Sequence, residues 1–503
     1  MAIEHIVIVG GGTAGWMAAA ALSRIRDGSD LKITLVESEQ IGTVGVGEAT
    51  IPPFVDFQKT LDIDEAEMMA ATQATFKLGI QFANWGQVGE SYIHPFGAYG
   101  YELGGIHFHQ VWHALQERGD KRPLQVFNLE TMAAYFGKFS RTQDYARDDL
   151  PPMNYAYHID ATAYARFLRA YAEKRGVVRR ESLVKDVGLH PESGYVTGIT
   201  LDNGEIIEGD FFVDCSGFRG LLIEQALNTG YDEWTHYLPC DRAVALPCNR
   251  DDGTPAPPFT RATAHSAGWQ WQVPLQTRNG NGHVYCSAYM EADEAHDILV
   301  TNLAGKPTAD PNFLRFVTGC RKKFWNKNVV ALGLASGFME PLESTSIHLI
   351  NTGVNKLIAT LSLDGVNEAQ ASTYNRVTRK EYERIRDFLV LHYKATRRDD
   401  SEFWNYCRTM DVPDTLTEKI EIFKANGQIF REEDELFTAT SWAAVMMGQG
   451  IAMHGTSPMA AGVIDGVAKE VDEMERSIKW LVQQMPGHQQ YVERYCPTTL
   501  KAA

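Results

Sequence analysis

A glycine-rich turn near the N-terminus constrains the fold more than any other feature of the chain. Residues 5–9 (HIVIV) form a continuous apolar run, as in a buried parallel strand. The run leads into residues 10–15 (GGGTAG) and then into a helix-forming segment at residues 16–25. Glycine permits a tight turn and the close approach of a pyrophosphate, which the positive end of the helix attracts. The pattern therefore predicts a dinucleotide-binding strand–turn–helix unit.

An acidic residue stands where a dinucleotide ribose needs one. Residues 32–38 (KITLVES) predict a second strand, and Glu37 follows Gly15 by 22 residues. A carboxylate at this position accepts hydrogen bonds from a ribose diol. A tight turn that binds nothing is the structural alternative. The residues of this part predicted to bind the cofactor are Gly10, Gly12, Thr13, Ala14, Gly15 and Glu37.

Two later segments favour FAD over NAD. Residues 204–220 have a strand pattern ending at Asp214, and they resemble the segment by which flavoprotein hydroxylases return to the nucleotide sheet. Residues 328–353 have the strand–glycine–helix form of the usual third flavin segment, although Leu334 follows Gly333 where an acidic residue is usual. Only one complete dinucleotide fingerprint is present. The sequence therefore predicts no NADPH site of its own, and reduced flavin that comes from outside.

The bulk composition excludes several classes of protein. The chain has 503 residues, with 47 basic against 64 acidic side chains, and its net charge of −17 disfavours binding to nucleic acid or to anionic membranes. It has no apolar run of about 18 residues, and its N-terminus reads as a strand and not as a signal peptide. Seven scattered cysteines without a Cys-x-x-Cys pair favour a reducing cytoplasm over a disulfide framework or a zinc site.

The pattern of the chain changes near residue 366. Beyond it amphipathic helical segments dominate, including residues 372–396 and 468–485. We therefore expect an α/β fold: an FAD-binding Rossmann-like module with an additional β-sheet, similar to flavin monooxygenases, in residues 1–365. Residues 366–503 are expected to form a mainly helical region that completes the substrate pocket.

Three histidines suggest a metal site that the sequence does not otherwise support. His107 and His109 would share one face of a strand, with His113 four residues further on. No carboxylate or cysteine partner is near them in the sequence, so no metal is predicted.

Five motifs together carry a family resemblance. They are GVGEATIP (45–52), FKLGIQF (76–82), HPF (94–96), WQWQVP (269–274) and GFMEPLESTSI (337–347). In this order they resemble the flavin-dependent halogenases of the tryptophan halogenase type, and a weaker similarity continues through residues 441–450 and 485–496. The resemblance implies that FADH2 from a separate flavin reductase, oxygen and bromide or chloride make hypohalous acid. This oxidant would travel through a tunnel to an electron-rich aromatic substrate.

The resemblance also assigns two catalytic residues. Lys77 is the only cation in residues 71–85, and it matches the family's lysine that meets the oxidant, either as a hydrogen-bond donor or as a haloamine. Poor solvation favours the neutral amine that a haloamine needs, but the sequence leaves both roles open. Glu343 matches the family's glutamate near the reacting halogen, which can orient the oxidant with the lysine and accept the proton lost by the arene. A structural Lys–Glu ion pair is the competing interpretation.

The remaining site residues are likewise implied by the resemblance. Backbone N–H groups of Thr345 and Ser346 would bind halide, and Ser346 stands where glycine is common, so a positive φ there would strain it. Trp269 and Trp271 alternate on a strand pattern and would keep substrates away from the flavin. The other implied residues are His94, Phe96, Phe437 and Trp442 for the substrate, and Gly47, Glu48, Ala49, Gly333 and Leu334 for the cofactor, with Gly45 in the same loop as Gly47.

The substrate-side sequence departs from tryptophan-specific relatives. Those relatives use a tyrosine-rich lid and a glutamate to grip the amino acid, whereas residues 431–450 contain the acids 432–435 and Phe437 but no tyrosine pair. We therefore expect indole or an indole derivative, and not free tryptophan, as the preferred substrate. An FAD-dependent aromatic monooxygenase and a non-catalytic flavoprotein are the alternatives. A cytoplasmic location is expected, and a homodimer is compatible with the sequence.

Overall fold

The chain divides into two compact units that alternate along the sequence. The structure is a computed structural model that describes residues 2–25, 30–41, 47–145, 152–250, 254–433 and 435–498. Gly45 and Asp434 lie outside these ranges. The first unit comprises residues 1–72, 159–235 and 315–383, and the second comprises residues 73–158, 236–314 and 384–503. The predicted boundary near residue 365 stays a prediction.

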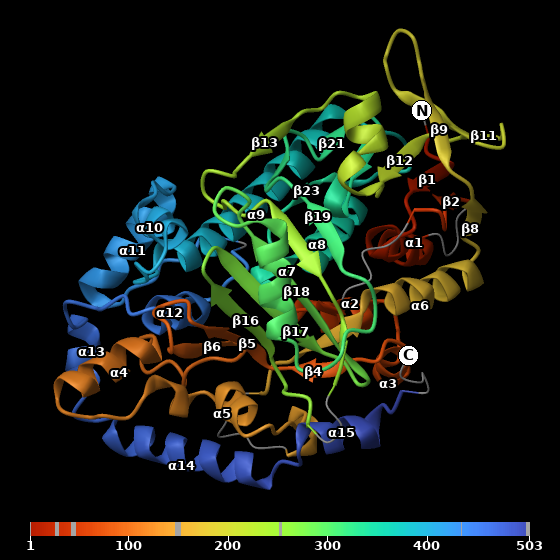
Figure 1. Cartoon of the computed structure of the whole chain (residues 1–503). Helices are drawn as coiled ribbons and strands as arrows, with labels where there is room; N and C mark the ends of the chain where they lie inside the picture. The colour runs from red at the N-terminus through yellow and green to blue at the C-terminus, as the bar shows by residue number, and fades with distance from the viewer. Residues whose placement is uncertain are drawn as a thin grey trace. The chain divides into compact units, whose positions relative to one another are not determined.

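A six-stranded sheet forms the centre of the first unit (Figure 1). All its neighbouring strands are parallel except β21, which pairs antiparallel with β22. The parallel pairing places the carboxyl ends of these strands at one edge of the sheet, where a dinucleotide-binding fold holds its ligand. In spatial order the strands are β21 (Trp325–Asn326), β22 (Val329–Ala331), β12 (Phe211–Asp214), β1 (His5–Val9), β2 (Lys32–Glu37) and β8 (Val178–Glu181).

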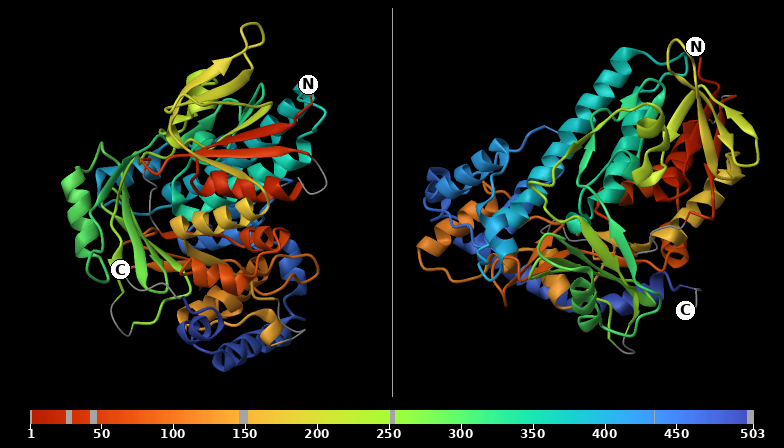
Figure 2. Two further views of the ribbon diagram at one scale, coloured as in Figure 1. Left: turned by 90° about the vertical axis from the view of Figure 1, so that its right-hand side faces the viewer. Right: turned by 45° about the horizontal axis from the view of Figure 1, so that its top comes forward.

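Helices and two small sheets complete the first unit. Helix α1 packs on both α6 and α8, and α2 packs on α8. The helices are α1 (Thr13–Ile25), α2 (Pro53–Thr60), α3 (Glu65–Ala71), α6 (Ala161–Lys174) and α8 (Thr345–Thr360). The small sheets are β11 (Ile206–Glu208), β10 (Val196–Leu201) and β9 (Val184–Leu189), then β13 (Tyr231–Glu233), β20 (Gly319–Arg321) and β23 (Gly337–Phe338). The β9–β10 hairpin projects from this unit as the yellow loop in both views of Figure 2.

An apolar core fixes the central strands of the first unit. Val7 and Val9 of β1 belong to a buried cluster with Ile199 of β10 and with Leu222 and Ile223 of the π-helix η4 (Leu221–Ala226). Burying an aliphatic side chain of this size stabilises a fold by about 1.5–3 kcal/mol. The strand that carries the glycine turn is therefore held from both the sheet and the segment after Asp214.

A mostly antiparallel sheet forms the centre of the second unit. Strand β5 pairs parallel with β16, and the other strand pairs recorded for this sheet are antiparallel. The spatial order is β19 (Asn312–Arg315), β14 (Arg242–Ala245), β18 (Arg278–Tyr285), β17 (Gly268–Pro274), β16 (Thr260–His265), β5 (Gly79–Ala83) and β6 (Ser91–Pro95), with β15 (Cys248–Asn249) beside β18. Separately, β4 (Thr75–Lys77) pairs antiparallel with β7 (Ala156–Asp160).

Helices make up most of the remainder of the second unit. Helix α7 packs on β18, α12 on β6, α14 on α5 and α15 on β4. The bounds are α4 (Phe108–Glu117), α5 (Leu129–Tyr135), α7 (Ala292–Thr301), α10 (Glu402–Thr409), α11 (Asp414–Asn426), α12 (Ala439–Gly448), α13 (Pro458–Val463), α14 (Ala468–Gln484) and α15 (His488–Tyr495). Helix α9 (Glu368–Lys394) contributes residues to both units.

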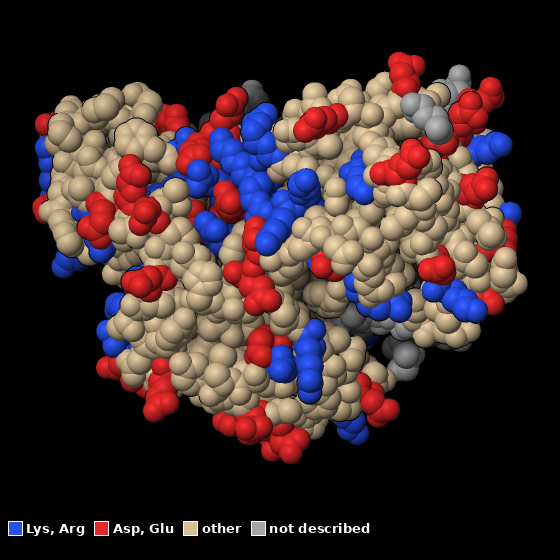
Figure 3. Space-filling view, turned by 90° about the horizontal axis from the view of Figure 1, so that it is seen from above, with Lys and Arg blue, Asp and Glu red and all other residues tan. Residues whose placement is uncertain are grey.

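The fold class expected from the sequence is confirmed. Rossmann-like strands lie in the first unit, a further sheet follows, and all the elements that the structure describes beyond residue 366 are helices. The prediction of a strand at His107 and His109 is wrong, because helix α4 begins in this segment. Within the described ranges, no helix is both long enough and apolar enough to cross a bilayer. Acidic and basic side chains share the face seen in Figure 3, where basic side chains gather near the middle.

Candidate functional site

The glycine turn of the first unit leaves no room for a side chain at Gly10 or Gly15. Gly10 has φ +113°, and a Cβ there would lie 2.2 Å from the carbonyl oxygen of Cys215. A Cβ on Gly15 would lie 1.8 Å from the carbonyl oxygen of Gly10. In contrast, a Cβ on Gly12 would meet nothing within 4 Å. The turn is therefore closely packed underneath and open at Gly12, which fits a pyrophosphate that approaches the backbone there.

Glu37 lies at the end of β2, directly over the glycine turn. A Cβ on Gly11 would lie 1.6 Å from its Oε2 atom. Its other oxygen, Oε1, accepts a 2.5 Å hydrogen bond from Arg179, and the indole N–H of Trp16 lies 3.3 Å from Oε2. The carboxylate is thus near the turn as predicted, but Arg179 offsets its charge. No local sequence pattern indicates that pair, because Arg179 lies on β8, 142 residues away.

The second and third flavin segments follow β12 and β22, which lie on the same side of β1, and both contact the turn. Asp214 ends β12 and accepts hydrogen bonds from the backbone N–H groups of Ser216, Leu222 and Ile223 at 2.8–3.0 Å. Gly333 has φ +62°, and a Cβ on it would lie 2.7 Å from that of Ala14. The predicted cofactor residues of these segments therefore come together within one unit, and their geometry fits FAD.

A buried carboxylate occurs in the motif at residues 45–52. Glu48 lies on the short strand β3 (Gly47–Ala49). Desolvation by burial raises its pKa to about 7, although part of the residue's surface stays accessible. The predicted contact of Gly47, Glu48 and Ala49 with the flavin stays a prediction, as does that of Leu334.

The predicted halide residues begin helix α8. Glu343 ends the short 3₁₀ helix η6 (Pro341–Glu343), and both Glu343 and Thr345 are buried. Positive φ occurs at Ser344 (φ +60°, ψ +35°) and not at Ser346, so the strain expected for Ser346 lies two residues earlier. A left-handed conformation costs a non-glycine residue about 1–2 kcal/mol. The turn at Ser344 leaves the N–H groups of Thr345 and Ser346 in the first turn of α8.

Lys77 is fully buried in the second unit. Its exposed fraction is 0%, and its Nζ atom lies 5.1 Å from the centre of the Phe96 ring. A buried ammonium costs several kcal/mol unless it has partners or loses its proton. Phe96 offers the electron-rich face of a ring, which attracts a cation. The structure therefore brings together two residues that the motifs predicted, one from β4 and one from the end of β6.

A neutral histidine neighbours Lys77. The Oγ1 atom of Thr75 donates to the carbonyl oxygen of Pro274 at 2.6 Å, so it accepts from Nδ1 of His158 at 2.9 Å. Nε2 of His158 then accepts from the hydroxyl of Thr260 at 3.0 Å. Burial, and next the charge of Lys77, lower the pKa of His158 well below its usual value. No sequence motif marks His158, because its partners are far away in the chain.

An aromatic cluster anchors the strand that carries Lys77. Phe76 points to the opposite side of β4 from Lys77, since side chains alternate along a strand. Its ring stacks on Phe139 with a centroid distance of 4.0 Å and contacts Tyr155 and Tyr491 edge to face. Its backbone N–H donates to His488 at 3.1 Å, which needs a neutral imidazole, and burial lowers the pKa of His488 to about 4. These contacts of Phe76, on the opposite side of β4, therefore fix the position of Lys77.

Trp269 and Trp271 are neighbours on β17, as the alternation predicted. Their ring centroids lie 6.2 Å apart, and both side chains are buried. Gly282 stands opposite Trp271 on β18, and a Cβ there would lie 2.0 Å from the indole. The glycine thus leaves the space that the indole fills. The role of the pair as a barrier toward the flavin stays a prediction.

Three of the predicted substrate residues share one aromatic cluster. Phe388 of α9 stacks on Phe437 at 3.7 Å and contacts Trp442 edge to face at 4.9 Å, while His94 lies 5.6 Å from the ring of Phe388. All four are buried. No sequence motif marks Phe388, because it lies within a helical pattern that is typical of an ordinary core.

A buried carboxylate next to this cluster is already paired. Glu435 accepts hydrogen bonds from Lys419 at 2.8 and 3.0 Å and from the indole N–H of Trp442 at 3.0 Å. Lys419 also lies 4.3 Å from the centre of the Trp442 ring. Glu435 closes the acidic run at residues 432–435, and it is only 3% exposed.

A further buried carboxylate lies beside the HPF motif. Glu130 accepts the backbone N–H of Asn154 at 2.8 Å, and a Cβ on Gly97 would lie 1.8 Å from its carboxylate. Desolvation raises the pKa of Glu130 to about 7. The glycine after Phe96 was the only sequence signal for this close approach.

Of the three histidines, His107 at the start of α4 and His109 within it have separate partners. His109 faces the carbonyl oxygen of Gly427 at 2.7 Å, and burial lowers its pKa to about 4. Nδ1 of His107 instead lies 3.2 Å from Glu102. Over the described ranges, no group of three metal-ligating side chains comes together.

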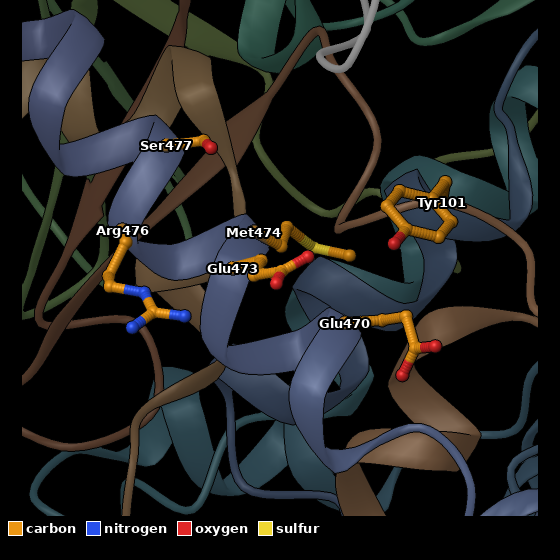
Figure 4. A pocket seen from close by; sticks show the side chains of 6 residues that line it. All are labelled: Tyr101, Glu470, Glu473, Met474, Arg476 and Ser477. Carbon is orange, nitrogen blue, oxygen red and sulfur yellow. The ribbon is translucent and has the colours of Figure 1, made fainter.

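A surface pocket of the second unit lies away from these residues. It has a volume of about 270 Å³ and is lined by Tyr101 together with five side chains of α14 (Figure 4). None of the predicted site residues lines it. Burial and the charges of Glu470 and Glu473 raise the pKa of Tyr101.

The fold and the glycine contacts define a flavoprotein of the FAD-binding, monooxygenase-like class. The family profile described as tryptophan halogenase matches residues 5–465, so the chain belongs to the tryptophan halogenase family. Members of this family are FADH2-dependent halogenating oxidoreductases that act on aromatic substrates and take reduced flavin from a separate reductase.

Individual relatives match over almost the whole chain. Tryptophan 6-halogenase SttH of Streptomyces toxytricini is 34% identical and covers 97% of each chain. Among solved structures, Xcc4156, a flavin-dependent halogenase from Xanthomonas campestris, is 44% identical with a TM-score of 0.95 over 100% of both chains. BrvH, a flavin-dependent halogenase from Brevundimonas sp. BAL3, is 43% identical with a TM-score of 0.93 over 98% of this chain and 99% of its own.

Proposed function

We propose that the protein halogenates an electron-rich aromatic, such as indole or an indole derivative, with bromide or chloride and through Lys77. The observation that carries the proposal is the fully buried Lys77 beside Phe96 and a neutral His158. A lysine in such surroundings is costly for stability, and a chemical role accounts for it. Hypohalous acid, made at the flavin, reaches this lysine through a tunnel.

The first unit holds the cofactor and the halide. Gly10 and Gly15 let the turn pack closely, Gly12 leaves the backbone open to a pyrophosphate, and Glu37 stands over the turn for the ribose. Bound FAD, reduced by a separate flavin reductase, would supply two of the four electrons that reduce oxygen, and the halide would supply the other two as it becomes oxidised. The N–H groups of Thr345 and Ser346 bind the halide, because the first turn of a helix presents unpaired N–H donors and a positive dipole end.

Lys77 then directs the halogenating oxidant to the arene. As an ammonium it donates a hydrogen bond to hypohalous acid, and as a neutral amine it forms a haloamine. His158 cannot compete as a second cation, because burial and the charge of Lys77 keep its pKa well below its usual value. Glu343 accepts the proton that the ring loses when it regains aromaticity.

The pairing of Glu435 supports a neutral aromatic substrate. A carboxylate that grips the ammonium of an amino acid must be available, whereas Glu435 is bound by Lys419 and Trp442. Displacing Lys419 would leave a buried charge without its partner, which costs about 3–5 kcal/mol. The rings of His94, Phe96, Phe437 and Trp442 hold the arene, and Trp269 and Trp271 keep it away from the flavin. The proposed location is the cytoplasm. A homodimer is compatible with the sequence.

Product analysis of a lysine variant tests the proposal. Wild type and Lys77→Met are incubated with a flavin reductase, FAD, bromide or chloride, and either indole or tryptophan, and the products are identified by mass spectrometry. We expect halogenated indole in preference to halogenated tryptophan, and a loss of roughly a hundredfold or more in Lys77→Met. Lys424→Met, which changes a partly exposed lysine of the same unit, is the matched control.

Two results would contradict the proposal. Full turnover in Lys77→Met would remove the role given to Lys77. Oxygenated product formed without halide would favour the aromatic monooxygenase instead.

A further inference from the structure

An arginine with three carboxylate partners lies beside the proposed ribose contact. Strand β8 pairs parallel with β2 at one edge of the six-stranded sheet, and Arg179 of β8 stands opposite Leu35. It is therefore a diagonal neighbour of Glu37, which ends β2. Nε of Arg179 donates to Oε1 of Glu37 at 2.5 Å. Nη1 donates to Glu181 at 3.1 Å and Nη2 to Glu39 at 3.4 Å, so all three guanidinium nitrogens are engaged.

One of these three ion pairs is shielded from solvent. The side chain of Arg179 is 13% exposed and that of Glu37 is 15% exposed, whereas those of Glu39 and Glu181 are 73% and 46% exposed. Exposed ion pairs add little to stability. The bond between Arg179 and Glu37 is therefore the one that the fold protects.

The strand register makes a carboxylate at position 37 unfavourable for the sheet alone. Glu37 pairs directly with Glu181 of β8. Like charges at directly opposite positions destabilise a pair of strands. Arg179 contacts both carboxylates and offsets their repulsion, but a neutral residue at position 37 would avoid it altogether. The carboxylate at the end of β2 thus calls for a use outside the sheet.

The bond to Arg179 orients the carboxylate toward the glycine turn. Because Oε1 of Glu37 is bound by Arg179, Oε2 stays on the side of the turn, where a Cβ on Gly11 would lie 1.6 Å from it. The indole N–H of Trp16 lies 3.3 Å from the same oxygen. One oxygen is therefore held by the edge strand, and the other faces the place proposed for the cofactor.

A second arginine near Glu37 is less suited to this role. Nη1 of Arg169, on α6, lies 3.8 Å from Oε1 of Glu37, and Nε of Arg169 donates to Glu173 at 3.2 Å. Its side chain is 35% exposed, so water screens its charge more than that of Arg179. Arg179 is therefore the main partner of Glu37.

Charge compensation matters here because the turn is proposed to hold a pyrophosphate. An unpaired carboxylate beside the turn would repel this anion. A carboxylate held by an arginine can accept hydrogen bonds from a ribose diol without that repulsion. The geometry thus combines an acceptor for the ribose with a cation for the neighbouring phosphates.

We infer that Arg179 is a positioning residue for the adenosine half of FAD. It directs one oxygen of Glu37 toward the ribose, and it offsets the negative charge that this carboxylate places beside the pyrophosphate. The inference rests on the proposed cofactor contacts of Gly12 and Glu37. Arg179 therefore contributes to the affinity for a flavin that has an adenosine half, and not to the affinity for a flavin without one.

Titrations with FAD and FMN separate this role from a general structural one. FMN has no adenosine half, so it cannot use the ribose contact. Each flavin is titrated with the FAD-free protein, and the change in flavin fluorescence gives the affinity. Wild type should bind FAD more tightly than FMN. We expect Arg179→Met to weaken FAD binding roughly ten- to hundredfold, as for a lost hydrogen bond to a charged group, and to leave FMN binding unchanged.

Three further variants make the result specific. Arg180→Met is the matched control, because Arg180 is the next residue of β8, points to the other face and pairs with exposed Glu205, so both flavins should bind as in wild type. Arg179→Lys keeps the charge but not the fork of donors, so its FAD affinity should be intermediate. Adding Glu37→Gln to Arg179→Met should recover part of the lost FAD affinity, because no unpaired carboxylate remains beside the phosphates.

The possible failures are distinguishable. An equal loss of FAD and FMN affinity in Arg179→Met, or unchanged FAD affinity in it, would overturn the inference and leave the cofactor site in place. If Arg179→Met does not fold, Arg179→Lys decides in the same way. Wild type that binds FAD no more tightly than FMN would instead overturn the proposed contacts of the adenosine half.

Discussion

Replacing Gly282 by alanine should dislodge the Trp271 indole. The two residues face each other across strands β17 and β18, and a Cβ on Gly282 would lie 2.0 and 2.1 Å from two carbons of the ring. Carbon atoms that are not bonded rest about 3.5–4.0 Å apart, so the ring must move by well over 1 Å. Trp269, with its ring centre 6.2 Å away, lies beside the indole that has to move.

The expected cost follows from overpacking. Adding a methyl group to a filled core destabilises a protein by about 1–3 kcal/mol. A loss of about 2 kcal/mol lowers the unfolding midpoint of a cooperative unit of about 250 residues by about 4–8 °C. Differential scanning calorimetry measures this shift, and near-ultraviolet circular dichroism reports the changed environment of the indole.

Gly462→Ala is the matched control for this experiment. Gly462 lies in helix α13 of the same unit, and a Cβ there meets nothing within 4 Å. Alanine in a helix is favoured over glycine by about 0.5–1 kcal/mol, so this variant should be as stable as wild type or slightly more stable. An unchanged midpoint and an unchanged near-ultraviolet spectrum in Gly282→Ala would refute the packing of Trp271 described above.

Three further predictions concern other parts of the site. Gly12→Ala should leave the unfolding midpoint of the FAD-free protein unchanged, because its Cβ meets open space, but should lower FAD affinity measured by fluorescence titration, since the pyrophosphate needs that space. Glu130 has a pKa raised to about 7, so wild type should lose roughly 3 kcal/mol of stability relative to Glu130→Gln as the pH rises from about 4.5 past 7, measured by urea unfolding at each pH. A constant difference across that range would contradict the pKa shift. Ser344→Gly should raise the unfolding free energy by about 1 kcal/mol by removing the left-handed strain, and an unchanged or lower value would show that no strain is stored there.

Local sequence patterns were sufficient to predict much of the fold of the first unit. The apolar run at residues 5–9, the glycine turn and the helix after it lie within 21 residues, and the structure has β1 and α1 at these places. The segment that ends at Asp214 was also recognisable, because a strand followed by glycine marks its return to the sheet. These signals are short in range, and each depends on backbone geometry that only certain residues allow.

The same local reasoning predicted the wrong element where the two-residue period of a strand overlapped the helical spacing of three and four residues. His107 and His109 alternate as in a strand, yet the segment is helix α4. Buried Phe108, Val111 and Leu115 follow the helical spacing of three and four residues, so the apolar positions carried the correct signal and the histidines distracted from it. The alternation of the two units along the chain left no comparable mark in the sequence.

The protonation states in the site could not be predicted from the sequence, because residues far apart in the chain determine them. The neutral form and tautomer of His158 follow from Thr75, 83 residues away, and from Thr260, 102 residues away. The neutral form of His488 is matched to the N–H of Phe76, 412 residues away. A motif can identify Lys77 as the residue that meets an oxidant, but whether a second cation stands beside it depends on these distant hydrogen bonds. Because a neutral neighbour leaves Lys77 as the group that donates to or reacts with the oxidant, the distant partners are as much a part of the proposed chemistry as the motif itself.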